Sequence, residues 1–287
     1  MVNIVFGLDD KFVKFCAAAA ASILTNHIIS KPEDKIHFYF LGNISSKNKN
    51  KLLELRKIQD FEYSFPKIDI SVFKGLPVGC WSQATYYRLL ICDYVSGGKA
   101  LYLDCDTIIN GDICKLWNLN INECLAAAVT HNEGGKGGGY FNAGVMIFDI
   151  KKLREFNFNE KWREYVKHIS PNSLKFPDQD ILNEVLKDNV FYMSIEYNAM
   201  GQHYKYMFER NTADKILIYH YTPGKPLNFD CPPSLRNLYF KYSKLTYWKE
   251  NMFHFWLRRF EVNPLFFLKP KYWRQIKEMR RQEKIGY

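Results

Sequence analysis

The chain has 287 residues, of which 47% are hydrophobic and 24% charged, values that are ordinary for a globular protein with a sizeable core. Its net charge is +10, but residues 236–287 carry 13 Lys or Arg against 4 Asp or Glu, so the part before them is nearly neutral. No apolar run reaches the roughly 18–20 residues of a membrane span, and the start lacks the pattern of a signal peptide. Seven scattered cysteines without C-x-x-C spacing favour reduced thiols over a disulfide framework or a zinc site.

Short apolar runs alternate with helical segments from the amino terminus onward. Strands are predicted at residues 3–8, 36–41 and 69–73, and helices at residues 12–24, 45–58 and 82–92. The alanine run at residues 17–21 favours the first helix, and Ser45 or Ser46 would cap the second. This alternation predicts βαβ units, and hence an α/β protein with a mostly parallel sheet that has helices on both faces.

The first predicted strand ends in the sequence Gly7-Leu8-Asp9-Asp10 and not in a G-x-G-x-x-G loop. An acidic turn can bind a sugar hydroxyl or a base edge, whereas a glycine-rich helix start would hold a pyrophosphate. This ending therefore disfavours a dinucleotide-dependent dehydrogenase.

An apolar run at residues 101–103, which we expect to form a buried strand, leads directly into Asp104, Cys105 and Asp106. Residues i and i+2 of an extended segment project to the same side, so both carboxylates can face one point at the carboxyl end of a central strand. Two such charges repel each other unless a divalent cation lies between them, and oxygen ligands suit Mn²⁺ or Mg²⁺. The alternative is a pair of solvated acids at a strand end.

A glycine-rich run at residues 134–139 precedes a predicted buried strand at residues 140–148. It lacks the G-K-[ST] ending of a phosphate loop, so we expect a mobile active-site lid, with an inert linker as the alternative. Near the start of the strand, Asn142 could orient a metal-binding acid or a hydroxyl, or it could simply fill a turn position.

Two further motifs place polar groups at the ends of predicted elements. Pro177 suits the first position of a helix, and acids in the first turn complement the helix dipole, but capping does not explain Gln179 beside Asp178. A strand at residues 216–219 brings His220 to a Gly/Pro turn that ends in Lys225. A single His after a strand is often structural, but here it would complete a mixed oxygen and nitrogen metal site, with Lys225 as a charge for a phosphate.

Six motifs in this order resemble glycosyltransferase family 8, and in particular its bacterial lipopolysaccharide and lipooligosaccharide α-galactosyl- and α-glucosyltransferases. They span about residues 2–230 and read VFGLDD, TYYRLL, LYLDCD, YFNAGV, PDQDILN and HYTPGKP. The resemblance implies a GT-A fold, with a single Rossmann-like mixed sheet flanked by helices, and a retaining hexosyltransferase. It further implies Mn²⁺, or else Mg²⁺, UDP-galactose or UDP-glucose as the donor, and a lipid-linked oligosaccharide core as the acceptor.

By position in these motifs, the resemblance implies a role for each candidate site residue. The metal ligands would be Asp104, Asp106 and His220. The diphosphate would be held by Gly224 and Lys225, and the uridine by Gly7, Asp9 and Phe12, with Cys105 also beside the UDP-sugar. The residues that surround the donor sugar and act in catalysis would be Arg88, Asn142, Asp178 and Gln179.

Retention of configuration leaves two mechanisms open. By family analogy Gln179 faces the anomeric carbon, and because an amide is a poor nucleophile we favour a front-face substitution in which the leaving phosphate takes the acceptor's proton. A double displacement with Asp178 as nucleophile is the alternative.

Other protein classes explain less of the sequence. A phosphatase that uses the D-x-D motif would need Thr where the chain has Ile108. A membrane- or nucleic-acid-binding protein would explain the basic tail, but clustered acids before residue 230 would repel nucleic-acid phosphates. We therefore expect no nucleic-acid partner.

The composition changes near residue 235, after a turn-forming Cys-Pro-Pro-Ser. We expect a catalytic domain at residues 1–235 and a basic, aromatic, helical appendage at residues 236–287. Aromatic rings sit well at the level of lipid headgroups, and basic side chains are attracted to an anionic surface. Short helices near residues 256–260 and 272–277 could hold a cytoplasmic protein at the inner face of the membrane, or they could pack on the catalytic domain.

Overall fold

The computed structural model describes residues 1–79, 81–121, 123–131, 139–170, 173–262, 270, 273–274 and 277. The strands are β1 (Val2–Gly7), β2 (Ile36–Leu41), β3 (Glu62–Ser64), β4 (Lys99–Leu103), β5 (Thr107–Ile109), β6 (Ala126–Thr130), β7 (Phe141–Asp149), β8 (Val190–Tyr192) and β9 (Ile218–His220). The α-helices are α1 (Val13–Asn26), α2 (Ser46–Leu53), α3 (Ile91–Tyr94), α4 (Cys114–Trp117), α5 (Ile150–Glu155), α6 (Phe158–His168), α7 (Pro177–Val185), α8 (Gly201–Glu209), α9 (Pro233–Ser243) and α10 (Met252–Val262). Short 3-10 helices lie at Pro32–Asp34, Glu54–Lys57, Ile70–Phe73, Gln83–Leu90, Ile195–Tyr197 and Ala213–Lys215.

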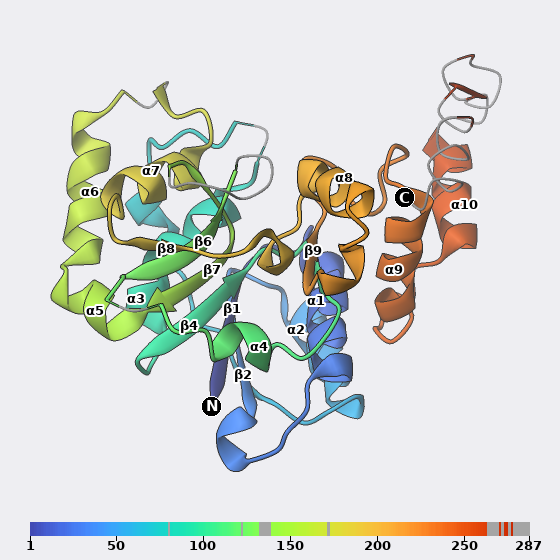
Figure 1. Cartoon of the computed structure of the whole chain (residues 1–287), viewed down its shortest axis with the longest axis horizontal. Coiled ribbons are helices and arrows are strands. Elements are labelled where there is room, and N and C mark those ends of the chain that lie inside the picture. The colour runs from blue at the N-terminus through green and yellow to red at the C-terminus, as the bar shows by residue number, and fades with distance from the viewer. Residues whose placement is uncertain are drawn as a thin grey trace.

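Within these described residues, seven strands form a mixed sheet in the order β3-β2-β1-β4-β7-β6-β8. The strands β1 to β4 pair in parallel, as do β6 and β8, whereas β7 runs antiparallel to β4 and β6. Figure 1 shows α5, α6 and α7 on one side of this sheet and α1 on the other, with α9 and α10 beyond α1. The predicted α/β fold, a mixed sheet flanked by helices, is confirmed.

The alternation of side chains along β1 divides the core between the two faces of the sheet. Ile4 and Phe6 pack with the residues of α1, whereas Val5 packs with the helices on the opposite face. The alanine run at residues 17–21 is fully buried, and its small side chains allow α1 to lie close to the sheet. The predicted first helix therefore forms for the expected reason.

Strand β4 lies in the middle of the sheet and ends directly before Asp104. It pairs with β1 on one side and with β7 on the other. The chain then enters β5, which pairs antiparallel with β9 in a separate two-stranded sheet. Thr107 lies opposite His220 in this pair, so the small sheet brings His220 to the end of β4.

The predicted strand at residues 69–73 is wrong. This segment forms the 3-10 helix Ile70–Phe73, and the third strand of that side of the sheet is instead β3. The carboxylate of Asp69 accepts hydrogen bonds from the backbone N–H of Ser71 at 2.9 Å and from its hydroxyl at 2.6 Å. Such local bonds stabilise a turn in competition with an extended strand.

Other local predictions hold. The predicted helix at residues 82–92 forms as the 3-10 helix Gln83–Leu90 followed by α3. Ser45 accepts a hydrogen bond from the backbone N–H of Asn48 at the start of α2, and Pro177 occupies the first turn of α7. Of the predicted lid at residues 134–139, all but Gly139 lies outside the described residues.

The predicted domain boundary near residue 235 falls in the first turn of α9 and stays a prediction. Helix α9 packs against α1, where Tyr239, Phe240 and Tyr242 join the buried core. Arg236 is fully buried, and its Nη2 donates to the carbonyls of Asn228, Phe229 and Cys231. None of the described helices combines the length and apolar character needed to cross a bilayer. Half of the predicted helix at residues 272–277 lies outside the described residues.

Candidate active site

The ends of β1 and β4 and the small sheet border a cavity of about 470 Å³. It is lined by eleven of the thirteen predicted site residues, namely Gly7, Phe12, Arg88, Asp104, Cys105, Asp106, Asn142, Asp178, Gln179, His220 and Lys225. Asp9 and Gly224 are not among the lining residues. The carboxylate of Asp9 instead accepts hydrogen bonds from the backbone N–H groups of Lys11 and Phe12, which stabilises the turn into α1.

Two carboxylates and an imidazole converge in this cavity. The Nε2 atom of His220 lies 3.6 Å from Asp104 Oδ2 and 3.8 Å from Asp106 Oδ1. Burial lowers the pKa of His220, although both carboxylates oppose the shift, and this favours the neutral imidazole. A Cβ atom on Gly144 would lie 2.2 Å from His220 Cε1 and 2.6 Å from Asp104 Oδ2, so only glycine leaves the space open. The three residues therefore offer the donor set of a divalent-cation site.

A chain of buried amides fixes the tautomer of His220. Asn198 Oδ1 lies 2.8 Å from His220 Nδ1, and Asn198 Nδ2 donates to Asn142 Oδ1 at 2.8 Å. The backbone N–H of Gly144, which can only donate, also contacts Asn142 Oδ1 at 3.0 Å, so the oxygen of Asn142 is identified and the orientation of Asn198 follows. The hydrogen of His220 must then lie on Nδ1, and Nε2 presents its lone pair to the carboxylates.

The buried side chain of Arg88 joins the end of β4 to α7. Its Nη2 lies 2.7 Å from Asp104 Oδ1 and its Nε 3.0 Å from Asp178 Oδ2. The guanidinium also lies over the ring of Tyr102, 4.4 Å from the ring centroid. Burial works against the charge of Asp104, but the cations around it, Arg88 foremost, lower its pKa. The carboxylate is thus held ionised and in a fixed orientation.

Asp178 has a partner for each carboxylate oxygen. Oδ2 faces Arg88, and Oδ1 accepts a short hydrogen bond from the hydroxyl of Thr85. Burial raises the pKa of Asp178 even though Arg88 and Thr85 act in the opposite direction. These two contacts fix the orientation of the carboxylate.

The amide of Gln179 is also fixed. Its Oε1 accepts hydrogen bonds from the backbone N–H of Ala143 and from Asn142 Nδ2, both at 3.0 Å. Because a backbone N–H only donates, the atom that faces Ala143 must be the oxygen. Both lone pairs of this oxygen are occupied, so it is poorly placed to act as a nucleophile.

Lys225 brings a positive charge beside the metal-ligand cluster. Its ammonium pairs with Asp106 Oδ2 and lies 5.9 Å from the ring centroid of Phe12. Burial opposes this charge, yet Asp106 raises the pKa of Lys225 and Asp104 adds to the effect. The group therefore stays cationic and suits the binding of a phosphate.

One wall of the cavity is aromatic. The ring centroids of Trp81 and Phe176 lie 6.0 Å apart, and those of His131 and Phe176 lie 6.3 Å apart. All three side chains line the cavity, and Trp81 is 42% exposed. Flat amphipathic rings at a cavity mouth suit the apolar face of a sugar.

Sequence reasoning missed this wall as well as Asn198, Thr85 and Tyr102. Tyr102 could have been found, because it lies two residues before Asp104 in the same strand and so projects to the same side. Asn198 carries no comparable signal, since it lies 22 residues before its partner His220 and outside any motif.

Comparison with known proteins gives consistent results. The family model described as glycosyl transferase family 8 matches residues 3–228. The chain is 29% identical over 279 residues to general stress protein A of Bacillus subtilis (86% of this chain, 95% of that protein). It is 27% identical over 250 residues to lipopolysaccharide 1,2-glucosyltransferase of Escherichia coli K12 (77% and 71%). Its structure is similar to that of galactosyltransferase LgtC in complex with donor and acceptor sugar analogues, with a TM-score of 0.73 and 26% identity over 86% of this chain and 96% of that one.

The structural similarity to LgtC confirms the predicted GT-A fold. The family model covers most of the chain, including every motif on which the sequence resemblance was based. The family match therefore favours a transferase over the two alternatives considered from the sequence, a phosphatase and a nucleic-acid-binding protein. The chain therefore belongs to glycosyltransferase family 8 and is a glycosyltransferase.

Proposed function

We propose that the protein is a retaining hexosyltransferase that moves galactose or glucose from UDP-galactose or UDP-glucose to a lipooligosaccharide or lipopolysaccharide core. The observation that carries this proposal is the cluster of Asp104, Asp106 and His220, with Lys225 beside it in the same cavity. A hexose is supported by the glucosyltransferase and galactosyltransferase activities that name the Escherichia coli relative and LgtC. Of these two proteins, only the Escherichia coli relative is named for lipopolysaccharide, and its name supports the proposed acceptor.

The donor set favours Mn²⁺, with Mg²⁺ as the alternative, because carboxylates suit both ions and the imidazole nitrogen suits the transition metal better. When bound, such a cation would offset the charge that develops on the departing diphosphate. Lys225 would add a second positive charge, with Gly224 nearby in the chain. The uridine side of the site would be formed by residues at or near the carboxyl ends of β1 and β4, namely Gly7, Asp9, Phe12 and Cys105.

For retention we infer a front-face substitution. The bond between the anomeric carbon and the phosphate oxygen breaks, the acceptor hydroxyl oxygen bonds to the same face, and the hydroxyl proton passes to the leaving UDP. The fixed contacts of Asp178 with Arg88 and Thr85 favour a positioning role for this carboxylate over a nucleophilic one. The fully occupied oxygen of Gln179 points to the same conclusion, and Asn142 holds it in place.

A panel of UDP-sugars tests the donor and the metal together. We expect slow UDP release from UDP-galactose or UDP-glucose with Mn²⁺, faster release when truncated lipooligosaccharide cores are added, and an α-linked product by NMR. The Asp104→Ala variant, folded by circular dichroism, serves as the control for contaminating hydrolases. Release that is unchanged after chelation, or equal in this variant, would contradict the metal assignment, and an inverted product would contradict the retaining mechanism.

We further propose that the carboxyl-terminal segment attaches the protein to the inner face of the cytoplasmic membrane. On α10, Phe253, Leu257 and Phe260 are 71%, 42% and 52% exposed. Their spacing of four and three residues puts them on one face of the helix. On the other face, the buried Phe255 packs against the core. This exposed apolar stripe, in a segment whose sequence is rich in Lys and Arg, has the character of an interfacial helix.

The structure sharpens the test of this attachment. Truncation before α9 would remove core residues such as Tyr239 and Tyr242, so substitution is the better experiment. Full-length protein should sediment with vesicles that contain phosphatidylglycerol, and the double variant Phe253→Ser, Phe260→Ser should sediment less. Ile70→Ser removes an equally apolar, 42% exposed side chain elsewhere and serves as the control. Equal sedimentation of all three proteins would refute the proposed role of α10.

A further inference from the structure

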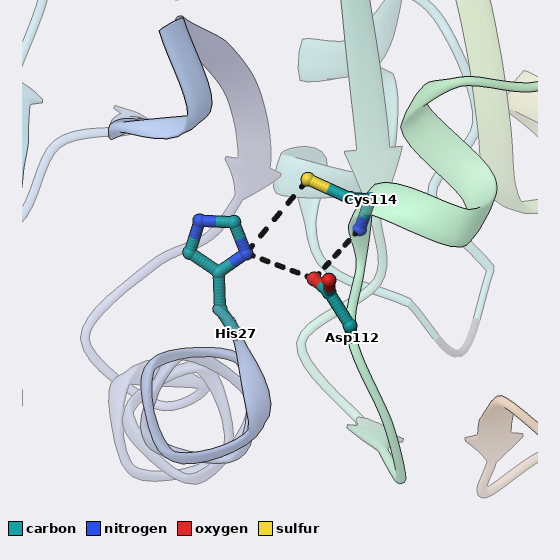
Figure 2. A group of neighbouring side chains, drawn as sticks. All are labelled: His27, Asp112 and Cys114. Atoms are coloured by element: carbon teal, nitrogen blue, oxygen red, sulfur yellow. Dashed lines mark hydrogen bonds and ion pairs between the residues drawn. The ribbon is translucent and has the colours of Figure 1, made fainter. Parts of the chain in front are cut away.

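A second group of metal-ligand side chains lies at the opposite end of α1 from the active site. His27 follows directly after α1, and Asp112 and Cys114 lie at the start of α4. Figure 2 shows these three side chains pointing toward one another from two separate segments. Helix α1 has 14 residues, so at about 1.5 Å per residue His27 lies roughly 20 Å from the end of α1 that borders the cavity.

The two contacts of His27 require a proton or a metal ion between its Nδ1 and Asp112. Its Nε2 lies 2.6 Å from the backbone carbonyl of Asp34, which can only accept, so Nε2 carries a hydrogen. Its Nδ1 lies 3.0 Å from Asp112 Oδ1. In a neutral imidazole this contact would join two lone pairs, so either a second proton or a metal ion must lie between the two atoms.

The third side chain favours the metal ion. Cys114 Sγ lies 3.9 Å from the same Nδ1 atom of His27, and the ligand atoms of all three residues lie within 4.8 Å of one another. With zinc bonds of about 2.0–2.1 Å to nitrogen, 2.0–2.2 Å to oxygen and 2.3 Å to sulfur, tetrahedral geometry puts nitrogen about 3.4 Å from oxygen and about 3.6 Å from sulfur. The observed 3.0 and 3.9 Å require shifts of a few tenths of an ångström.

The surroundings also suit a metal centre. The Asp34 carbonyl holds the imidazole with Nδ1 turned inward, and the backbone N–H of Cys114 donates to Asp112 Oδ1 at 3.0 Å. Hydrogen bonds of this kind orient the side chains that bind the ion in known metal sites. His27 is buried, whereas the side chain of Asp112 is 24% exposed, which leaves an approach for an ion and for a water ligand.

We propose that His27 Nδ1, an oxygen of Asp112 and Cys114 Sγ bind a Zn²⁺-class ion, with water as the fourth ligand. A thiolate with an imidazole selects such an ion over Mn²⁺, whereas the active-site cluster has no sulfur ligand among its three residues. The ion would connect the segment after α1 to the start of α4, which is a structural role separate from transfer. No zinc site is expected from the sequence alone, because His27 lies 85 and 87 residues before Asp112 and Cys114 and the cysteines have no C-x-x-C spacing.

Two other readings of the cluster are distinguishable. One is a plain ion pair between a protonated His27 and Asp112, in which the thiol takes no part. The other is a reactive thiol, which is disfavoured because burial, with Asp112, raises the pKa of Cys114 to about 11. A coordinated thiol, by contrast, is deprotonated by the metal itself.

Cobalt substitution tests the proposal on the full-length protein. After chelation, addition of Co²⁺ should give the near-ultraviolet thiolate-to-metal absorption and the visible bands of a tetrahedral site. The double variant Asp104→Ala, Asp106→Ala should keep the thiolate band, because it alters only the active-site cluster. Cys114→Ser should lose the band, and the matched control Cys124→Ser, at another partly buried cysteine, should keep it.

Thermal unfolding gives a readout that does not depend on spectra. In the Asp104→Ala, Asp106→Ala background, which lacks the active-site carboxylates, Zn²⁺ should raise the Tm of the chelated protein and of its Cys124→Ser derivative. It should not raise the Tm of the Cys114→Ser or His27→Gln derivative, each first shown to be folded by circular dichroism. If either variant fails to fold, the wild-type cobalt spectrum still decides. Absence of a thiolate band in folded wild type, or a band that survives Cys114→Ser, would overturn the metal site and leave the ion pair.

Discussion

Asn198 offers the sharpest test of how the active site is built, because it touches neither the cation nor the sugar in the proposed function. It holds His220 Nδ1 at 2.8 Å and Asn142 Oδ1 at 2.8 Å, and it is fully buried. In Asn198→Ala the Nδ1–H of His220 loses its acceptor in the protein interior. The alternative tautomer would place the hydrogen on Nε2, where the lone pair is needed for a metal.

The expected size of this effect follows from two independent estimates. An unsatisfied buried donor costs about 1–3 kcal/mol. Loss of a hydrogen-bonding partner behind a metal ligand lowers metal affinity by roughly 10–100-fold, which is about 1.4–2.7 kcal/mol. We therefore expect the Mn²⁺ concentration for half-maximal UDP release to rise by about this factor. Turnover at saturating Mn²⁺ should change much less, because Gly144 still holds Asn142, which in turn holds Gln179.

The assay is UDP release as a function of Mn²⁺ at a fixed concentration of UDP-sugar. Asn198→Asp is the informative partner variant, because its carboxylate can still accept from His220 Nδ1 while the bond to Asn142 is lost. It should keep a near wild-type Mn²⁺ dependence. Asn189→Ala, which removes a partly exposed amide bonded to the carbonyl of Lys187, is the matched control. A wild-type Mn²⁺ dependence in folded Asn198→Ala would refute the idea that this relay sets the tautomer.

Three further predictions concern residues that line the cavity. Asp104→Ala or Asp106→Ala should lower Mn²⁺-dependent turnover by more than roughly 100-fold, because even the loss of a residue that only supports a metal ligand costs roughly 10–100-fold. Near wild-type activity in either folded variant would exclude that residue as a ligand. Gln179→Ala should slow turnover by about 100-fold or more without changing the α configuration of the product. If mass spectrometry instead identifies a glycosyl adduct trapped on Asp178 of the wild type, the mechanism is a double displacement. Gly144→Ala should lower the free energy of unfolding by about 1–3 kcal/mol and weaken Mn²⁺ binding, because the new Cβ would fill the space between Asp104 and His220. Unchanged stability in denaturant unfolding together with an unchanged Mn²⁺ dependence would show that the cluster relaxes freely.

The sequence by itself determined the parts of this protein that depend on local periodicity and on short-range chemistry. Apolar runs and an alanine-rich segment predicted β1, β2 and α1 close to their observed bounds. They also predicted the end of β4 before Asp104, and Pro177 predicted the start of α7. The placement of Asp104 and Asp106 two residues apart after a buried strand predicted that both carboxylates face one cavity, because side chains in extended backbone alternate with a period of two. The order of the six motifs was enough to predict the family.

Tertiary structure decided what depends on contacts between distant segments. The pairing of β5 with β9 brings His220 beside Asp106, and the loop before α8 supplies Asn198; neither contact has a signature within a window of a few residues. The same limit hid the approach of His27 to Asp112 and Cys114. At residues 69–73 the apolar pattern favoured a strand, but the Asp69 side chain stabilised a turn by bonding Ser71. Composition likewise marked residue 235 as a boundary, whereas the packing shows that Tyr239 and Tyr242 beyond it are buried and that their helix contacts α1. Burial could not be predicted here because it depends on contacts that form only in the folded protein, between segments that are distant in the sequence.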